Sequence, residues 1–460
     1  MVTPTGEQLK NNKHPVNKIL GFWRKFKAFL GHRLILEVAI LGSFIAFTIN
    51  PGSLGDIMRI CGAIFLINVL LGNYHIGDVT EGHLVVLGIF LLTLLINAFM
   101  PDKMIHSRSF RYFLTLPGMI LAIHCLSKRT RPDSRTLLIY CSIAVVALTI
   151  QLVAYHTVES VVNSGGLESY GLSANMHHFG SFAGLILPVL FYFSTQIKGW
   201  LRFLCIAGVI VAFYLLWESS SRISWFAFFS SILIAILLFL RNRRLLMGLA
   251  GFFTISIIAA LVSGIAAIKD RIWDILSNWR SEERVTVWTD TLNMFGDNSV
   301  KDWLFGHGIG SFRYYFPDYN TFILDGKVVD WSFPHNVFFQ IIFENGLIGL
   351  VTIFGGMVLL MIGLWRGYHR LEHDSDRYLL VTIFILFWIN LIHCSLTLSF
   401  YHKYFIYPLS MIIGISLILL EKIGQNKPLK SLNWYQGFTI LIMDKMPILN
   451  RWVSKRKTDT

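Results

Sequence analysis

Charged residues are scarce in this 460-residue chain. They make up 15% of it, whereas hydrophobic residues make up 54%. Soluble domains contain about a quarter charged residues, so the composition excludes an ordinary soluble protein and predicts an integral membrane protein. Cations outnumber carboxylates and give a net charge of +13. Because the basic residues gather in short connectors and at both ends, they favour membrane orientation and contact with anionic lipid over nucleic-acid binding.

Cysteines and clustered metal ligands are also few. The five cysteines lie within apolar runs and show no paired spacing, which predicts small buried side chains and supports neither a disulfide framework nor a metal site. The adjacent pair His177-His178 points in two directions if helical and has no carboxylate nearby, so it is a weak metal ligand. We therefore expect no metal and no cofactor.

The apolar runs contain few ionisable groups at mid-depth. The ionisable residues of these runs lie instead near the predicted ends; they are Glu37, Arg59, Arg111 and Arg202. An ion-coupled transporter usually needs carboxylates at mid-depth or paired broken helices, so a small-solute transporter is a less favoured alternative. The one segment that resembles a broken helix in the sequence is 343–346.

Long apolar runs dominate what is present, and they predict an all-α polytopic membrane protein. A span needs about 17–25 mainly apolar residues. About twelve candidates meet or approach this length, at 34–49, 57–72, 84–100, 110–126, 137–155, 179–197, 200–217, 223–240, 245–268, 347–365, 379–398 and 404–420.

The basic connectors predict the orientation of these spans. With both termini cytoplasmic, the basic segments 127–136, 241–244 and 366–377 all face the cytoplasm, as basic loops do. One external connector, with Lys103, Arg108 and Arg111, is an exception. The resulting divisions are a cytoplasmic N-terminal segment (1–33), spans one to nine (34–268), an external loop (269–336), spans ten to twelve (337–420) and a cytoplasmic or interfacial tail (421–460). The polar and basic 1–33 segment is not expected to be a cleavable signal peptide.

The external loop 269–336 is unusually long for a connection between spans, which favours a functional role. Helical spacing of Val285, Trp288, Leu292 and Phe295 predicts an amphipathic helix on the membrane or the bundle. A small hairpin is expected over 322–329, around Asp325-Gly326. The glycine-rich segment 306–312 lacks a preceding strand and a following Lys-Ser/Thr pair, so we expect a close-packed turn and no nucleotide loop.

Three basic residues are the candidate catalytic groups. Arg222 lies in a tight external connector, where a permanently charged fork suits a lipid-linked pyrophosphate; a surface arginine with its stem along the membrane is the alternative. Arg284 shares a predicted helix face with Trp288 and Arg280, and is either a second anion clamp or a partner of a neighbouring glutamate.

The third candidate, His335, lies where the chain re-enters the membrane. A neutral imidazole can accept a proton near physiological pH, and this position faces both lipid-borne and aqueous groups. Asn336 is a candidate for orienting a substrate group. The alternative for this pair is a structural histidine in a helix-capping segment.

Taken together, these segments resemble the O-antigen ligase and polymerase superfamily of bacterial membrane proteins, which act on undecaprenyl-pyrophosphate-linked glycans. The residues that carry the resemblance are Ser221–Trp225, Arg284–Trp288, Gly306–Phe312 and Pro334–Leu350. The large external loop after the ninth span favours the ligase branch. The resemblance implies catalytic roles for Arg222, Arg284 and His335. We further expect Arg280, Asn336, Trp288 and Ser221 to bind the substrate.

The implied function is a metal-independent, inverting glycosyltransferase of the bacterial inner membrane with its active site facing the periplasm. Its donor would be an undecaprenyl-pyrophosphate-linked glycan and its acceptor lipid A–core or another glycan. A repeat-unit polymerase with another lipid-linked glycan as acceptor remains open. A protein O-oligosaccharyltransferase is less favoured, because only about 40 residues follow the last predicted span.

Overall fold

A computed structural model of the protein describes residues 54–71, 80–98, 105–129, 144–154, 176–219, 221–239, 283–324, 327–329, 331–371 and 374–425, with short helical pieces between residues 21 and 47 and at 156–157. The predicted ninth span, Arg280 and the tail beyond residue 425 lie outside the described residues. The described chain is nearly all helical, as the sequence predicts.

Within the described residues, the elements form a succession of helices interrupted by one small hairpin. In order they are α4 (Leu54–Leu70), α5 (Glu81–Ala98), α6 (Ser107–Arg129), α8 (Met176–Gln196), α9 (Trp200–Glu218), α10 (Arg222–Phe239), α13 (Glu283–Gly296), α14 (Val300–Phe305), α15 (Phe312–Tyr315), the 3-10 turn η3 (Phe316–Asp318), β1 (Ile323–Leu324), β2 (Lys327–Val328), α16 (Val337–Tyr368), α17 (Asp374–Leu396) and α18 (Lys403–Gln425).

Five of the described helices are long and apolar enough to cross a membrane, namely α8, α9, α16, α17 and α18. Shorter apolar helices cover Gly82–Ala98, Ala144–Ala154 and Ile223–Phe239, within predicted spans three, five and eight. The protein is therefore a multi-pass membrane protein. The total of about twelve spans and the position of the termini stay predictions.

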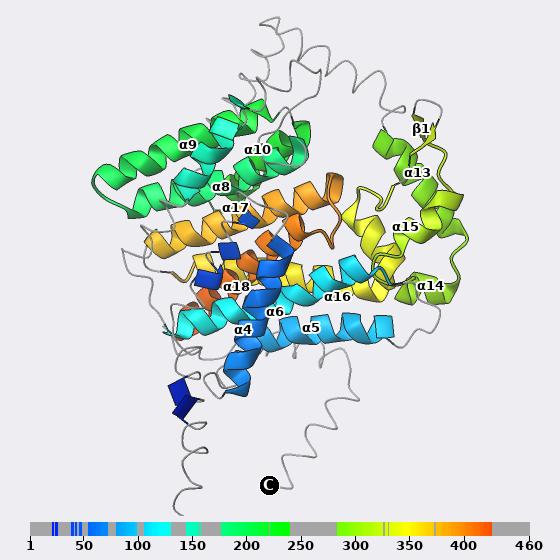
Figure 1. The fold of residues 1–460 in the computed structure, drawn as a ribbon, viewed down its shortest axis with the longest axis horizontal. Helices are drawn as coiled ribbons and strands as arrows, with labels where there is room; N and C mark the ends of the chain where they lie inside the picture. Colours follow the sequence, from blue (N-terminus) through cyan, green and yellow to red (C-terminus); the bar gives the residue numbers. More distant parts are fainter. Residues whose placement is uncertain are drawn as a thin grey trace, which may run out of the picture.

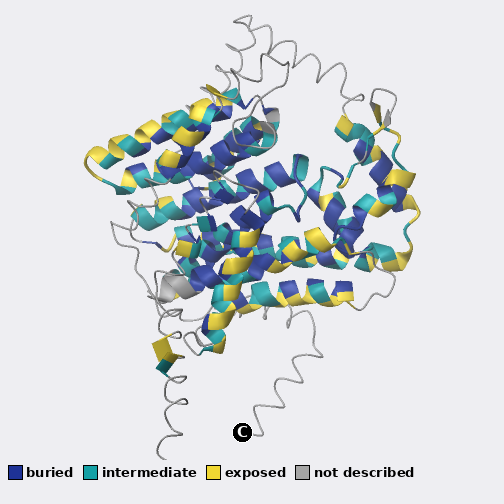
Figure 2. Ribbon diagram, viewed as in Figure 1, coloured by how far each residue is buried: buried dark blue, intermediate teal, exposed yellow. Residues whose placement is uncertain are grey.

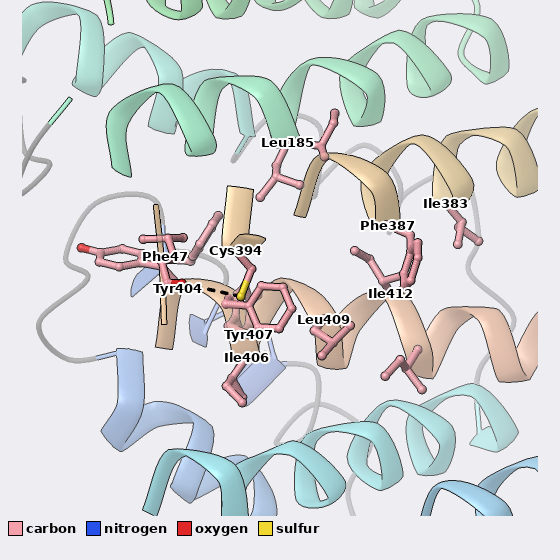
Figure 3. Packing of buried hydrophobic residues seen from close by; sticks show 14 of the residues in the cluster. Phe47, Leu185, Ile383, Phe387, Cys394, Tyr404, Ile406, Tyr407, Leu409 and Ile412 are labelled. Atoms are coloured by element: carbon pink, nitrogen blue, oxygen red, sulfur yellow. Dashed lines mark hydrogen bonds between the residues drawn. The ribbon is translucent and has the colours of Figure 1, made fainter. Parts of the chain in front are cut away.

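Most of the long helices lie alongside one another as a bundle, while α4 crosses α6 steeply (Figure 1). Buried side chains concentrate at the centre of this bundle, and exposed side chains cover its outer helices (Figure 2). The core lies where α8, α17 and α18 meet, with Leu185, Phe387 and Leu409 among its members (Figure 3). Exposed apolar side chains on α9, such as Phe203 and Ile210, suit contact with lipid tails.

A separate lobe packs at one end of the bundle and is formed by α13, α14, α15 and the hairpin (Figure 1). Its own core consists of Val287, Met294, Phe295, Phe312, Phe316 and Phe343. Phe343 belongs to α16, and its ring stands 5.9 Å from that of Phe312 and 6.1 Å from that of Phe295. The first turns of α16 are thus anchored in the lobe by aromatic packing.

The hairpin prediction is confirmed, and the prediction for the amphipathic helix is partly wrong. Ile323 pairs with Val328 in the antiparallel hairpin β1–β2. The helix α13 forms and Phe295 of the predicted face is buried, but Leu292 of that face is 54% exposed, whereas Val287 and Asp290 are buried. The reason is tertiary, because α13 packs on the lobe aromatics and Asp290 accepts hydrogen bonds from Thr321 N at 2.8 Å and its Oγ1 at 2.9 Å.

Helix α16 begins ten residues earlier than the predicted tenth span at 347–365, and it is broken at Gly346. Gly346 has φ 69°, a left-handed conformation that glycine adopts without steric cost. The turns before the break bury the polar side chains of Gln340, Glu344 and Asn345 inside protein. These polar residues made the segment look unlike a span, yet protein partners satisfy them: Glu344 Oε2 accepts from Gly310 N at 2.8 Å.

The glycine-rich segment 306–312 is the close-packed turn that the sequence predicts. A Cβ on Gly306 would stand 2.5 Å from the backbone of Glu344 and Asn345, and one on Gly346 would stand 2.2 Å from the carbonyl oxygen of Leu304. Backbone hydrogen bonds from His307 N to Phe343 O and from Gly308 N to Glu344 O, both 2.8 Å, complete the contact. Two positive-φ glycines therefore fit the lobe against the break in α16.

Candidate functional site

His335 stands at the junction between the lobe and α16. Among the described residues it is the one non-glycine residue with a left-handed backbone, at φ 50°. Such strain costs about 1–3 kcal/mol and persists where the surroundings impose it, often at functional sites. Here Asn336 imposes it from one side, because its side chain caps α16 by accepting hydrogen bonds from Phe338 N at 3.0 Å and Phe339 N at 3.2 Å.

Trp288 fixes the other side of His335. Its indole Nε1 donates to the carbonyl oxygen of Pro334 at 3.0 Å, which ties α13 to the residue before the histidine. The imidazole lies between two aromatic rings, with centroids 4.9 Å from Trp331 and 4.4 Å from Phe333. The ring position is therefore set by the lobe rather than by the membrane helices alone.

Arg284 lies one turn before Trp288 on α13, close enough for its charge to act on His335. The pKa of His335 is lowered from its ordinary 6.5 to about 3, chiefly by burial and then by the charges of Arg284 and His177. A hydrogen bond with the backbone of Thr397 opposes this shift. The imidazole is thus neutral at physiological pH.

The two ring nitrogens of His335 have different surroundings. Nδ1 is buried and has no hydrogen-bond partner among the described residues. The hydrogen bond with the Thr397 backbone raises the pKa of His335, which is the effect of a bond that the ring donates. Because Nδ1 has no partner among the described residues, Nε2 is the donor. A neutral imidazole held through Nε2–H leaves the lone pair of Nδ1 able to accept a proton.

Ser221 is linked to this site through His177. The Ser221 hydroxyl oxygen lies 3.1 Å from His177 Nδ1, and Ser221 also accepts from Ser224 Oγ at 2.8 Å at the start of α10. Arg222 begins α10, but its side chain, like the whole of Arg280, lies outside the described residues. The structure thus gathers Arg284, Trp288, His335 and Asn336 directly and Ser221 through a histidine.

Four further histidines near the site were not among the sequence candidates. Besides His177, they are His178, His393 and His402; the ring of His178 stacks on that of His402 with centroids 5.4 Å apart. Burial lowers the pKa of His402 to about 4, with Lys403 and Arg108 adding to the shift. The signal in the sequence was the pair His177-His178: adjacent helical residues point apart, and here one ring contacts Ser221 and the other His402.

Metal binding has no support in the part of the chain that the structure describes: no three His, Cys, Asp or Glu side chains gather there as a metal site would require.

A network of polar side chains on the first turns of α16 supports the site. Gln340 contacts Ser399 Oγ at 2.8 Å and accepts from Phe400 N at 2.8 Å, which ties α16 to the segment before α18.

Residues 206–354 match the sequence model of the family described as O-antigen ligase. The matched segment is about a third of the chain. The resemblance to the O-antigen ligase and polymerase superfamily is thereby confirmed. The matched segment of the domain runs from α9 to α16 and contains Ser221, Arg222, Arg284, Trp288 and His335, whereas His177, His402 and α18 lie outside it. No curated protein matches the chain significantly.

The lowered pKa of His335 predicts a pH effect on stability. The unfolded histidine takes up a proton as pH falls below about 6.5, while the folded one stays neutral down to about 3. The wild-type protein should therefore lose stability relative to His335→Asn as pH falls from 6.5 to 4.5, by up to roughly 1.4 kcal/mol per pH unit. Thermal unfolding in detergent at several pH values measures the difference. Parallel curves for the two proteins would show that His335 is not buried in its neutral form.

Proposed function

We propose that this protein transfers a preassembled glycan from undecaprenyl pyrophosphate to the hydroxyl of an acceptor sugar at the periplasmic face of the inner membrane. The acceptor that we favour is lipid A–core. The observation that supports the proposal is the convergence of Arg284 and a neutral, buried His335 at the junction of the lobe and α16, within an O-antigen ligase domain. An arginine fork suits a pyrophosphate, and a neutral imidazole suits a hydroxyl.

In the proposed reaction the acceptor oxygen attacks the anomeric carbon of the donor sugar. The bond from that carbon to the pyrophosphate oxygen breaks, and undecaprenyl pyrophosphate leaves with the electron pair. His335 Nδ1 takes the proton of the attacking hydroxyl, and attack opposite the leaving group inverts the anomeric centre. The donor is already activated, so the step needs neither a nucleotide nor, in this proposal, a metal.

Arg284 would stabilise the negative charge that grows on the departing pyrophosphate, and Arg222 would be its partner at the start of α10. Removing one such preorganised charge typically costs about 10²–10³ in rate. Both substrates are tethered to the membrane, so positioning them in one site supplies a further part of the acceleration. Trp288 and Asn336 act in this scheme by fixing the backbone on either side of His335.

A repeat-unit polymerase would use the same donor chemistry with a second lipid-linked glycan as its acceptor. The two functions differ in what accumulates when the gene is deleted. For the ligase, we expect naked lipid A–core together with lipid-linked polymer. For the polymerase, a single repeat unit would be attached to the core.

The direct test combines purified protein in lipid nanodiscs, an undecaprenyl-pyrophosphate-linked glycan and a lipid A–core acceptor. We expect a slower-migrating glycolipid to form and undecaprenyl pyrophosphate to be released in equal amount, as measured by gel electrophoresis and mass spectrometry. Parallel reactions supply only lipid-linked glycan, so a longer lipid-linked chain would identify a polymerase instead. Release of undecaprenyl pyrophosphate in none of these reactions would contradict the proposed function.

A further inference from the structure

A second cluster of cations surrounds a hollow away from the Arg284 and His335 site. The hollow has a volume of about 320 Å³ and is lined by Arg59 of α4, Arg108, Arg111 and Tyr112 of α6, and Lys403 of α18. Of these five lining residues, all within the described part of the chain, four are cationic and none is acidic. We refer to this feature as the basic hollow.

The basic hollow lies on the same side of the protein as the lobe. The start of α6 is fixed to the glycine-rich turn, because His106 N donates to Ile309 O at 2.8 Å and Arg313 Nη1 lies 2.8 Å from His106 Nε2. Lys403 begins α18, directly after His402. Arg108 and Arg111 are the exception to the basic-inside pattern in the sequence, so their predicted position on the external side calls for a function.

Hydrogen bonds and an ion pair orient two of these cations, Arg59 and Arg111. Arg59 donates through Nε to Gly55 O at 3.0 Å and pairs with Asp56 at 2.6 Å, and Arg111 donates through Nε to Ser107 O at 3.2 Å. Each guanidinium has five N–H donors, so these bonds engage only part of its capacity. The Tyr112 hydroxyl adds a neutral donor. A fixed set of forked cations with a hydroxyl is suited to phosphate oxygens.

The positive potential of the cluster reaches its neighbours. Burial lowers the pKa of His106, and Arg313, Arg108 and Arg111 lower it further. Lys403 and Arg108 act in the same direction on His402, after burial. Because His402 stacks on His178 and His177 acts on His335, two histidine pairs connect the basic hollow with the candidate catalytic site.

We propose that the basic hollow binds a phosphate group of a membrane lipid, and that this lipid is the phosphorylated acceptor. The hollow lies where α6 and α18 begin, at the level expected for lipid headgroups, and its volume exceeds that of a lone phosphate ion. The donor pyrophosphate is assigned to Arg284 and Arg222, so a second group of four cations fits a second anionic lipid. The choice of the acceptor rests on the proposed function, whereas binding of a lipid phosphate does not.

The test measures lipid binding without turnover. Protein in phosphatidylcholine nanodiscs is titrated with a bis-phosphorylated lipid A glycolipid and with its dephosphorylated form, and bound lipid is counted by native mass spectrometry. In the double variant Arg108→Gln/Arg111→Gln we expect at least roughly tenfold weaker binding of the phosphorylated form, since charge-assisted hydrogen bonds are lost. Binding of the dephosphorylated form should not change.

The matched control is Arg366→Gln/Arg370→Gln, which removes two exposed arginines near the far end of α16 and should leave affinity unchanged. Equal loss in both double variants, or no loss in either, overturns the proposal. If phosphatidylglycerol competes as effectively as the glycolipid, the result supports a lipid-phosphate site but overturns the acceptor assignment. Displacement by inorganic phosphate at the same concentration overturns the requirement for a lipid.

Turnover then separates this inference from the proposed function. With active protein, the double variant should raise the KM for the acceptor about tenfold, in line with the binding loss, while kcat and the KM for the donor stay near their wild-type values. An equal fall in kcat for every acceptor would place the arginines in catalysis instead and overturn the inference. If the wild-type protein transfers no glycan, the proposed function fails and the binding comparison still decides the basic hollow.

Discussion

The His335→Asn variant should lose about 10²–10⁴ in kcat, the usual contribution of a general acid or base. Asparagine tolerates the left-handed backbone that His335 adopts at φ 50°, so the fold should survive while the proton acceptor is removed. His335→Ala should lose as much activity. Single-turnover transfer in nanodiscs measures the chemical step, and cells carrying either variant should fail to attach polymer to their surface.

The control for this prediction is His369→Ala, at an exposed histidine that ends α16 far from the lobe. It should retain wild-type turnover. Comparable unfolding temperatures for the wild-type protein and His335→Asn at pH 7 are needed to assign the loss to chemistry. Normal surface polymer in cells that carry His335→Asn as their sole copy would remove His335 from the mechanism.

Gly346→Ala should destabilise the contact between the lobe and α16 by about 2–5 kcal/mol. Forcing a residue with a Cβ into left-handed backbone costs roughly 1–2 kcal/mol, and overpacking typically adds about 1–3 kcal/mol. The new Cβ would stand 2.2 Å from the carbonyl oxygen of Leu304, and a backbone atom cannot move away by changing rotamer. Because Phe343 and Glu344 join the lobe beside this glycine, we also expect transfer activity to fall sharply.

The same helix supplies a matched control. Gly355 lies in regular helix, and a Cβ there would meet no atom within 4 Å. Gly355→Ala should therefore be neutral or stabilising by up to about 1 kcal/mol, the difference in helix propensity. Thermal unfolding and the rate of limited proteolysis within the lobe compare the two variants. Equal stability and equal protease resistance would show that the close approach at Gly346 is not required.

The sequence predicted the helical membrane class, most helix positions, the hairpin and the close-packed glycine turn. These features depend on local composition and periodicity, which a single segment contains in full. The sequence also singled out Arg284, Trp288 and His335. Each was recognisable because a charged or polar group beside an apolar run has few explanations.

The burial of the polar first turns of α16 and the buried face of α13 could not be predicted in this way. Gln340, Glu344 and Asn345 look unsuited to a span, and only their partners Gly310, Ser399 and Tyr401 make their burial acceptable. The face of α13 depends on where the aromatic side chains of a distant segment lie. Periodicity identifies a helix face but not the surface that covers it.

Local chemistry in the sequence thus indicated which groups are candidates for binding pyrophosphate or accepting a proton. Tertiary structure alone decided that Arg284 and His177 act on His335, and that Arg59, Arg108 and Lys403 share one hollow. The physical reason is that charge interactions and burial depend on distance in space. Residues separated by hundreds of positions come within that distance only when the helices pack.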